Sequence, residues 1–267
     1  MFSFKFDFKF VLVFIGLFFL GVFVWQKQMT PEPQSEKLVV GMMNGWPPFM
    51  SINQAGEMEG FDVDVAQLVA QRLGRKLEIR DLGSVQTIFI ALEQGIIDLA
   101  MSAFDMTQER MKVYNMVKYT SREYLSVMIL FWKQVPTGIK SLQDVICAGI
   151  RVAVEPGSGQ EKYLDTFKNV SKVTIPAMQD LVMELRFGKA GAGLVEPSVA
   201  RRLEKQTPEL VFIEQKLPTE FKVIGDGITL KKNNLTLTAE VTKVIEQLKK
   251  EGILQQLEAK WQIDGGA

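Results

Sequence analysis

The segment 101–110 contains the residues best suited to chemistry in this sequence. It follows an apolar run that is typical of a buried strand. Ser102 and Ala103 are small enough to let a ligand approach the backbone, and Thr107 can cap a following helix. Arg110 would then lie about one turn inside that helix, where its planar guanidinium can hold a carboxylate through parallel hydrogen bonds. A surface arginine at a polar helix start is the alternative.

Three further features suit ligand binding just after predicted strands. Trp46 precedes two prolines, and it either packs in the core or presents its ring to a ligand. The loop Gly157-Ser158-Gly159 can hold an anion with its backbone N–H groups, although a plain strand-to-helix turn has the same pattern. Glu196 precedes Pro197, and it either stabilises the helix terminus or faces a ligand.

These residues need strands and helices that bring them together. The predicted strands are 37–42, 76–82, 96–101, 151–154, 173–175, 193–195 and 221–230, and helices are predicted to fill most of the intervening sequence and the region after 233. Alternating strands and helices predict a mostly parallel sheet covered by helices, with ligands at the carboxyl ends of the strands. Trp46 and the 102–110 segment both follow strand ends, which favours a shared site.

Composition excludes several kinds of function. Lys+Arg and Asp+Glu both total 31, so there is no bulk attraction to nucleic acid or to an anionic membrane. The chain has no histidine and one cysteine, which excludes Ser-His-Asp catalysis, Cys-His catalysis and Cys/His zinc sites. Cys147 stands in an apolar run and is predicted to be a small buried hydrophobe. We expect no catalytic residue, metal or cofactor.

The amino terminus reads as an export signal. Residues 10–25 form an almost unbroken apolar run, and Lys5 and Lys9 precede it. No small-x-small cleavage site follows, so we predict that residues 1–27 form an uncleaved signal-anchor, with a cleaved signal peptide as the alternative. Residues 28–36 form a polar linker with prolines. The body is expected to be periplasmic or otherwise extracytoplasmic, tethered by residues 10–25 or released after cleavage.

Six motifs in order carry a resemblance to a known family. They are Trp46-Pro47-Pro48-Phe49, Gly60-Phe61-Asp62-Val63-Asp64-Val65-Ala66, Ala91-Leu92-x-x-Gly95-x-x-Asp98, Thr107-x-Glu109-Arg110, Gly157-Ser158-Gly159 and Gly252-x-Leu254 with Lys260-Trp261. Residues 37–263 thereby resemble the polar amino-acid-binding family of periplasmic solute-binding proteins (family 3), the receptors of ABC importers.

The resemblance implies a fold and its domains. The expected class is α/β, with two α/β lobes joined by a two-crossover hinge, the type II periplasmic-binding-protein fold, behind the N-terminal hydrophobic segment. Residues 37–123 and 223–267 would form lobe 1, and residues 124–222 would form lobe 2. The lobes of such proteins close over a ligand by hinge motion.

The resemblance also implies how one end of the ligand is held. Arg110 matches the arginine that grips the α-carboxylate of the ligand. Ser158 and Gly159 match the loop of the second lobe whose backbone N–H groups hold the same carboxylate. Trp46 matches the aromatic residue that stacks on the ligand side chain.

Acidic residues are implied at the other end. Ala103, through its carbonyl, and Asp105 match positions that receive the α-ammonium, and Glu196 matches its acidic partner. Asp105 departs from the family pattern by adding a charge, and it either shares the ammonium with Glu196 or partly neutralises Arg110. Glu155 occupies a position that selects the side chain and can face a cationic one.

Three acidic residues around one pocket predict a basic or amide amino acid such as arginine or glutamine. The expected function is an extracytoplasmic receptor that delivers this ligand to an ABC permease and acts as a monomer. One alternative is an enzyme on the same scaffold, similar to cyclohexadienyl dehydratases, with Asp105 and Glu196 as an acid/base pair. Another alternative is a tethered amino-acid sensor.

Overall fold

The computed structural model describes residues 36–175 and 178–263, and the side chains of Met178 and Gln179 are not described. The chain divides into two units, residues 1–36 and 37–267. The predicted signal segment, 1–27, lies outside the described residues, as does the predicted linker apart from Glu36. No helix among the described residues is long and apolar enough to cross a membrane.

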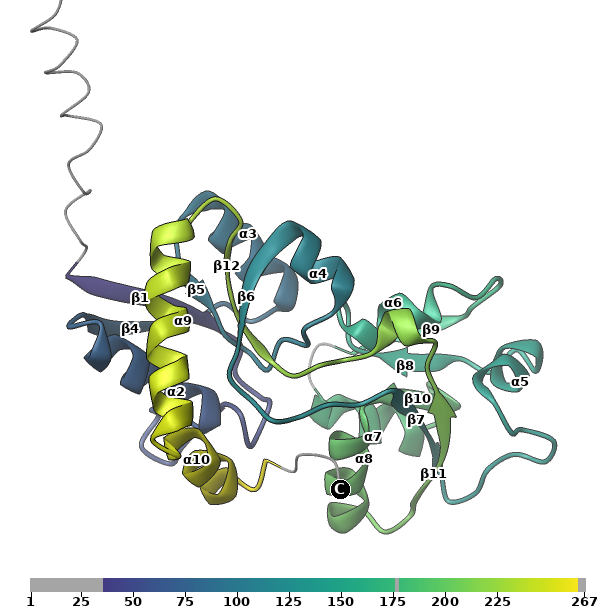
Figure 1. Ribbon diagram of the computed structural model, residues 1–267. Coiled ribbons are helices and arrows are strands. Elements are labelled where there is room, and N and C mark those ends of the chain that lie inside the picture. Colours follow the sequence, from purple (N-terminus) through teal and green to yellow (C-terminus); the bar gives the residue numbers. More distant parts are fainter. Residues whose placement is uncertain (1–35, 176–177, 264–267) are drawn as a thin grey trace, which may run out of the picture. The chain divides into compact units, whose positions relative to one another are not determined.

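The first lobe is built on a five-stranded sheet (Figure 1). Its strand order is β4 (Lys76–Asp81), β1 (Lys37–Met42), β5 (Leu99–Ala100), β12 (Gly227–Lys231) and β6 (Tyr114–Lys118). Strand β1 pairs in parallel with β4 and β5, and β12 runs antiparallel to β5 and β6. A hairpin of β2 (Ser51–Ile52) and β3 (Met58–Glu59) follows the loop after β1.

Helices cover both faces of this sheet. Successive side chains of β1 point to opposite faces, so each face has its own core. Leu38, Val40 and Met42 share one core with α2 (Phe61–Arg72), α9 (Leu235–Lys250) and α10 (Ile253–Trp261). Val39 and Met43 pack with α3 (Val85–Gln94) on the other face. The short helix α4 (Gln108–Val113) leads into β6.

The second lobe has its own five-stranded sheet. Its strand order is β11 (Leu210–Lys216), β7 (Ser126–Trp132), β10 (Ala192–Val195), β8 (Val152–Val154) and β9 (Lys172–Thr174). Strand β8 is parallel to β9 and β10, whereas β7 is antiparallel to β10 and β11.

The side chains of β7 alternate between the two faces of the sheet and contribute to a separate hydrophobic core on each face. Val127, Ile129 and Phe131 pack with α5 (Leu142–Cys147) and α6 (Gly159–Leu164). Met128 and Leu130 pack on the opposite face with α7 (Met178–Arg186) and α8 (Pro197–Gln206).

Two crossovers connect the lobes, residues 119–125 and 217–226, and the second contains the 3-10 helix η1 (Thr219–Phe221). They pair with each other, since Tyr124 and Val223 exchange backbone hydrogen bonds of 3.1 and 3.0 Å. Two α/β lobes and two crossovers make up the fold class that was predicted, and that prediction is confirmed.

Several local predictions were wrong. The strand predicted over 221–230 begins only at Gly227, because η1 and a positive φ of 135° at Gly225 interrupt extended backbone before it. Strands β2, β3, β6, β7 and β11 were not predicted. Cys147 is exposed, not buried. It ends α5, where Val145 and Ile146 turn inward and Cys147 falls on the other side of the helix.

Gly60 fixes the loop that carries Trp46. Its φ is 137°, and a Cβ at this position would overlap the carbonyl oxygen of Phe49. The next residues hold the same loop, since Phe61 N donates to Pro48 O and Asp62 N donates to Phe49 O, both at 3.0 Å. The start of α2 therefore anchors the loop from Trp46 to Phe49.

We expect Gly60→Ala to lower the free energy of unfolding by more than about 3 kcal/mol, because backbone strain and steric overlap both act. Gly56→Ala is the matched control, since Gly56 also has a positive φ of 80° but has no atom within 4 Å of an added Cβ. Strain alone predicts a cost of about 1–2 kcal/mol there. Urea unfolding measures both values, and equal losses would contradict the role given to Gly60.

Candidate ligand-binding site

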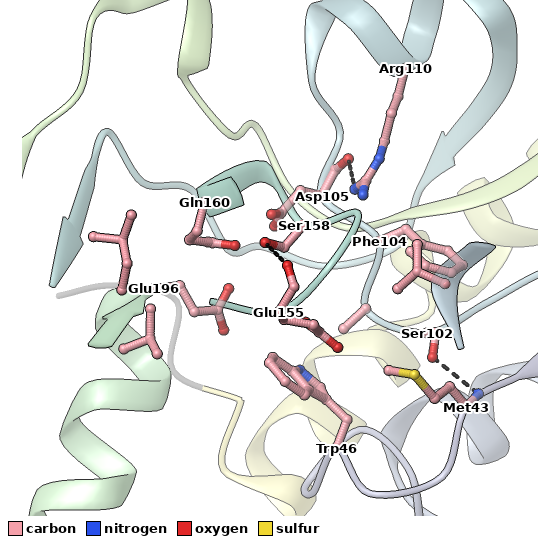
Figure 2. A pocket seen from close by; sticks show the side chains of 14 residues that line it. Met43, Trp46, Ser102, Phe104, Asp105, Arg110, Glu155, Ser158, Gln160 and Glu196 are labelled. Atoms are coloured by element: carbon pink, nitrogen blue, oxygen red, sulfur yellow. Dashed lines mark hydrogen bonds between the residues drawn. The ribbon is translucent and has the colours of Figure 1, made fainter. Parts of the chain in front are cut away.

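A cavity between the two lobes collects most of the predicted binding residues (Figure 2). Its lining comprises Met43, Trp46, Val85, Ser102, Ala103, Phe104, Asp105, Arg110, Glu155, Ser158, Gln160, Leu194, Val195 and Glu196. Seven of the eight predicted residues are therefore brought together. The eighth, Gly159, does not line the cavity, but a Cβ on it would lie 3.4 Å from Asp105 Oδ2.

The lining residues of lobe 1 stand where strands end. Trp46 follows β1, while Ala103 and Asp105 follow β5. Arg110 lies in the first turn of α4, and Thr107 caps this helix as predicted, because its Oγ1 accepts from the Arg110 N–H at 3.2 Å. The carboxyl ends of β1 and β5, which are parallel neighbours, thus bring Trp46 and the 102–110 segment to one edge.

Lobe 2 contributes from the ends of its own parallel strands. Glu155 follows β8, and Glu196 follows β10 directly before α8. Ser158 caps α6, since its Oγ accepts from Glu161 N at 3.0 Å and donates to Glu155 O at 2.7 Å. Its backbone N–H donates to Glu155 O at 3.3 Å, whereas the N–H of Gly159 has no acceptor among the described residues.

Asp62 holds the loop after β5 in place. Its Oδ2 accepts from the N–H of Ala103 at 2.8 Å, and its Oδ1 accepts from the hydroxyl of Tyr119 at 2.6 Å. Ala103 has a left-handed φ of 48°, which a fixed hydrogen bond helps to maintain. Asp62 is fully buried, and this burial raises its pKa to about 7. Sequence reasoning saw Asp62 only as part of a family motif.

Arg110 is buried and spans the two lobes. Its Nη1 donates to the backbone oxygen of Asp105 at 3.1 Å, and its Nη2 donates to Gly157 O at 3.0 Å. The guanidinium also lies 5.8 and 5.6 Å from the ring centres of Phe89 and Phe104. Both of these hydrogen bonds go to backbone oxygens, and no carboxylate pairs with it within residues 36–175 and 178–263. Its charge is therefore available to an anion in the cavity.

Three carboxylates face the same cavity in different states (Figure 2). Glu196 is hydrogen-bonded at both oxygens, by Arg122 Nη2 at 2.6 Å and by Ser198 Oγ at 2.6 Å. Asp105 Oδ1 and Glu155 Oε1 are buried without a hydrogen-bond donor among the described residues. Burial, followed by the charge of Glu196, raises the pKa of Asp105 and that of Glu155 to about 7.

Sequence reasoning missed Arg122. It lies in the first crossover, is 3% exposed, and its Nη2 lies 3.4 Å from Asp226 Oδ1 and 3.6 Å from Asp105 Oδ1. Its guanidinium also stands 5.0 Å from the ring centre of Phe49. The only signal in the sequence was an arginine inside a crossover between apolar segments, which does not reveal its partners.

The raised pKa values of Asp105 and Glu155 predict how the free energy of unfolding changes with pH. The folded chain keeps protons on Asp105 and Glu155 that the unfolded chain releases near the ordinary values of 3.8 and 4.5. This contribution is complete below about pH 4 and is lost as pH rises through about 7, so the free energy of unfolding should fall between them. No histidine titrates in this range.

We expect Glu155→Gln to flatten this fall, because the neutral amide releases no proton. The measurement is urea unfolding of the ligand-free protein at several pH values. Glu57→Gln, an exposed carboxylate in the turn between β2 and β3, is the matched control and should keep the wild-type slope. Identical slopes in all three proteins would contradict the raised pKa of Glu155.

Comparisons with known proteins identify the family of this chain. The family of bacterial extracellular solute-binding proteins, family 3, matches residues 38–264. The probable ABC transporter arginine-binding protein ArtJ of Chlamydia trachomatis is 29% identical over 230 residues, which cover 86% of this chain and 87% of that protein. The L-cystine-binding protein TcyJ of Escherichia coli K12 is 28% identical over 227 residues, covering 84% and 82%.

A solved structure shows the same fold. A mutant of ArgBP from T. maritima is 28% identical and superimposes with a TM-score of 0.75 over 86% of this chain and 96% of that one. Since the family match spans both lobes and both crossovers, the protein belongs to family 3 of the bacterial extracellular solute-binding proteins.

Proposed function

We propose that this protein is the substrate-binding component of an ABC importer and binds L-arginine in the cavity between its lobes. One observation carries the choice of ligand. Asp105 from lobe 1 and Glu155 from lobe 2 each hold a buried carboxylate oxygen without a donor among the described residues. Such oxygens are costly unless a ligand pairs with them. A ligand with two cationic groups can pair with both carboxylates. The relative ArtJ is named a probable arginine-binding protein.

Arg110 is assigned to the α-carboxylate of the ligand. It is the cation in the cavity lining, and backbone carbonyls occupy two of its donors in the structure. A guanidinium has five N–H donors, so further donors remain for a carboxylate. We assign the N–H of Gly159, the first residue of α6, as a second donor for this group, since it has no acceptor among the described residues.

Glu155 is assigned to the cationic side chain of the ligand. Its side chain and the ring of Trp46 both line the cavity (Figure 2). A planar guanidinium can bind a carboxylate through two parallel hydrogen bonds and can also stack on an indole ring. A glutamine side chain is neutral and leaves the charge of Glu155 uncompensated, which favours arginine over an amide ligand.

Ligand entry requires the lobes to separate. The cavity has a volume of about 40 Å³, which is room for a few waters and far less than the roughly 300 Å³ or more of a typical small-molecule site. Contacts between the lobes include Arg110 to Gly157 O and an ion pair of 2.8 Å between Glu109 and Lys162. We propose that residues 37–123 with 223–267 form one moving lobe and 124–222 the other, and that the crossovers act as the hinge.

The proposed role involves no chemical conversion. An enzyme on this scaffold would need an acid/base pair, and Asp105 with Glu196 was the candidate pair. Both oxygens of Glu196 are already engaged by Arg122 and Ser198, so its carboxylate is not free to exchange a proton with a substrate. We therefore expect no turnover of prephenate or arogenate by the purified protein.

Location and partners follow from the family. Its members are extracellular solute-binding proteins, so the body works outside the cytoplasm. We propose that residues 10–25 tether the protein to the membrane, that the protein is a monomer, and that an ABC permease receives the ligand.

Calorimetric titration of the full-length protein tests the proposal, after unfolding and refolding to remove any bound ligand. We expect L-arginine to bind with micromolar or tighter affinity. L-Citrulline has nearly the same shape without the charge, and we expect it to bind roughly 10- to 100-fold more weakly, because a charge-assisted hydrogen bond is lost. L-Glutamine and L-cystine should also bind more weakly than arginine.

Two variants assign the ends of the ligand. Arg110→Met should abolish binding of arginine and citrulline alike, whereas Glu155→Gln should weaken arginine roughly 10- to 100-fold and leave citrulline within about threefold. Glu57→Gln is the control and should bind like the wild type. Tighter binding of citrulline than of arginine by the wild type would reject arginine as the ligand.

A further inference from the structure

The two carboxylates at the ammonium end of the cavity are not equivalent. Both oxygens of Glu196 accept short hydrogen bonds from the protein itself, from Arg122 and from Ser198. Asp105 Oδ1 is instead buried without a hydrogen-bond donor among the described residues, with Arg122 Nη2 3.6 Å away, and the Tyr124 hydroxyl interacts with the same carboxylate. Figure 2 shows that the two residues enter the cavity from different elements, Asp105 from the loop after β5 and Glu196 from the start of α8.

Arg122 is positioned to keep its ion pair with Glu196 when a ligand binds. Its side chain is almost completely buried, and Glu196 is its nearest carboxylate, at 2.6 Å, with Asp226 at 3.4 Å and Asp105 at 3.6 Å. Beyond these carboxylates, the ring of Tyr124 lies 5.8 Å from the guanidinium. A buried arginine that lost its closest carboxylate would face a large desolvation cost, so the pair resists exchange.

Binding to Glu196 and binding to Asp105 therefore have different costs for a ligand ammonium. To bind Glu196 closely, it must compete with a guanidinium that is already in place. To bind Asp105, it only has to approach an oxygen that lacks a donor, and pairing removes the cost of leaving that oxygen buried and unsatisfied. The second route is favoured because it disturbs only the longer Arg122–Asp105 contact of 3.6 Å and leaves the 2.6 Å pair of Arg122 and Glu196 in place.

We propose that Arg122 is a positioning residue, a built-in cation that occupies Glu196 and thereby leaves Asp105 to receive the α-ammonium of the ligand. This inference rests on the proposed function, since it divides the roles within the same amino-acid site. Glu196 then ties lobe 2 to the hinge through Arg122, and Asp105 recognises the amino group.

The test compares L-arginine with 5-guanidinopentanoate, which is the same molecule without its α-ammonium. Calorimetry of the full-length protein gives the ratio of the two affinities, and this ratio measures how well the ammonium is recognised. Asp105→Asn and Glu196→Gln are matched variants, because each neutralises one buried carboxylate at the same end of the cavity. A change in stability or lobe closure shifts both ligands equally and leaves the ratio unchanged.

We expect Asp105→Asn to lower the ratio at least 10-fold, as loss of a charge-assisted hydrogen bond predicts. We expect Glu196→Gln to keep the ratio within about threefold, whatever it does to the two affinities. A ratio that falls in Glu196→Gln to the same extent or further would overturn the proposal, because Glu196 would then be an ammonium acceptor.

Arg122 itself is tested by combining variants. In Arg122→Met, Glu196 is freed to accept the ammonium, so adding Asp105→Asn should lower the ratio much less than it does in the wild type. An equally large fall in both backgrounds would overturn the role of Arg122. Arg75→Met is the control, since Arg75 is a mostly buried arginine paired with Glu240 at 3.0 Å away from the cavity.

The test still gives an answer if Arg122→Met does not fold or if the ligand is not arginine. If Arg122→Met does not fold, as thermal unfolding would reveal, the Glu196→Gln ratio still decides, because a Glu196 not occupied by Arg122 would contribute to ammonium recognition. If the wild type binds another L-amino acid and not arginine, the proposed ligand fails. The ratio is then measured with that amino acid and its analogue without the amino group.

Discussion

Burial of carboxylates between two lobes is the constraint on which this site depends. Asp105, Glu155 and Glu196 line one cavity, while Arg110 and Arg122 are the arginines beside them. Charges removed from water are tolerated only when they are paired or neutralised. Glu196 is paired within the protein. For Asp105 and Glu155, burial instead raises the pKa of each to about 7.

The fold makes this arrangement possible because the two lobes face each other at the ends of their strands. Each lobe presents the carboxyl ends of its parallel strands to the other, so short loops from both sheets supply the polar groups. Because Asp105 belongs to lobe 1 and Glu155 to lobe 2, a ligand with two cationic groups favours the approach of the lobes. Arg110 reinforces this by contacting Gly157 across the cleft. The proposed function thus couples ligand charge to lobe closure.

Motifs with a local cause could be predicted from the sequence. The Thr107 cap places Arg110, and Pro197 at a helix start places Glu196, since both effects act within a few residues. Arg122 and Asp226 could not be predicted as partners, because folding brings them together across 104 positions of sequence. The exposed Cys147 shows the same limit on a smaller scale, as an apolar run does not reveal which helix face is buried.

The most direct measurement is a crystal structure of the protein with L-arginine bound. The account predicts the α-carboxylate of arginine on Arg110, its α-ammonium within hydrogen-bond distance of Asp105, and its guanidinium on Glu155 beside Trp46. Arg122 should remain on Glu196. A ligand bound in the reverse direction, or an ammonium that has displaced Arg122 from Glu196, would contradict it.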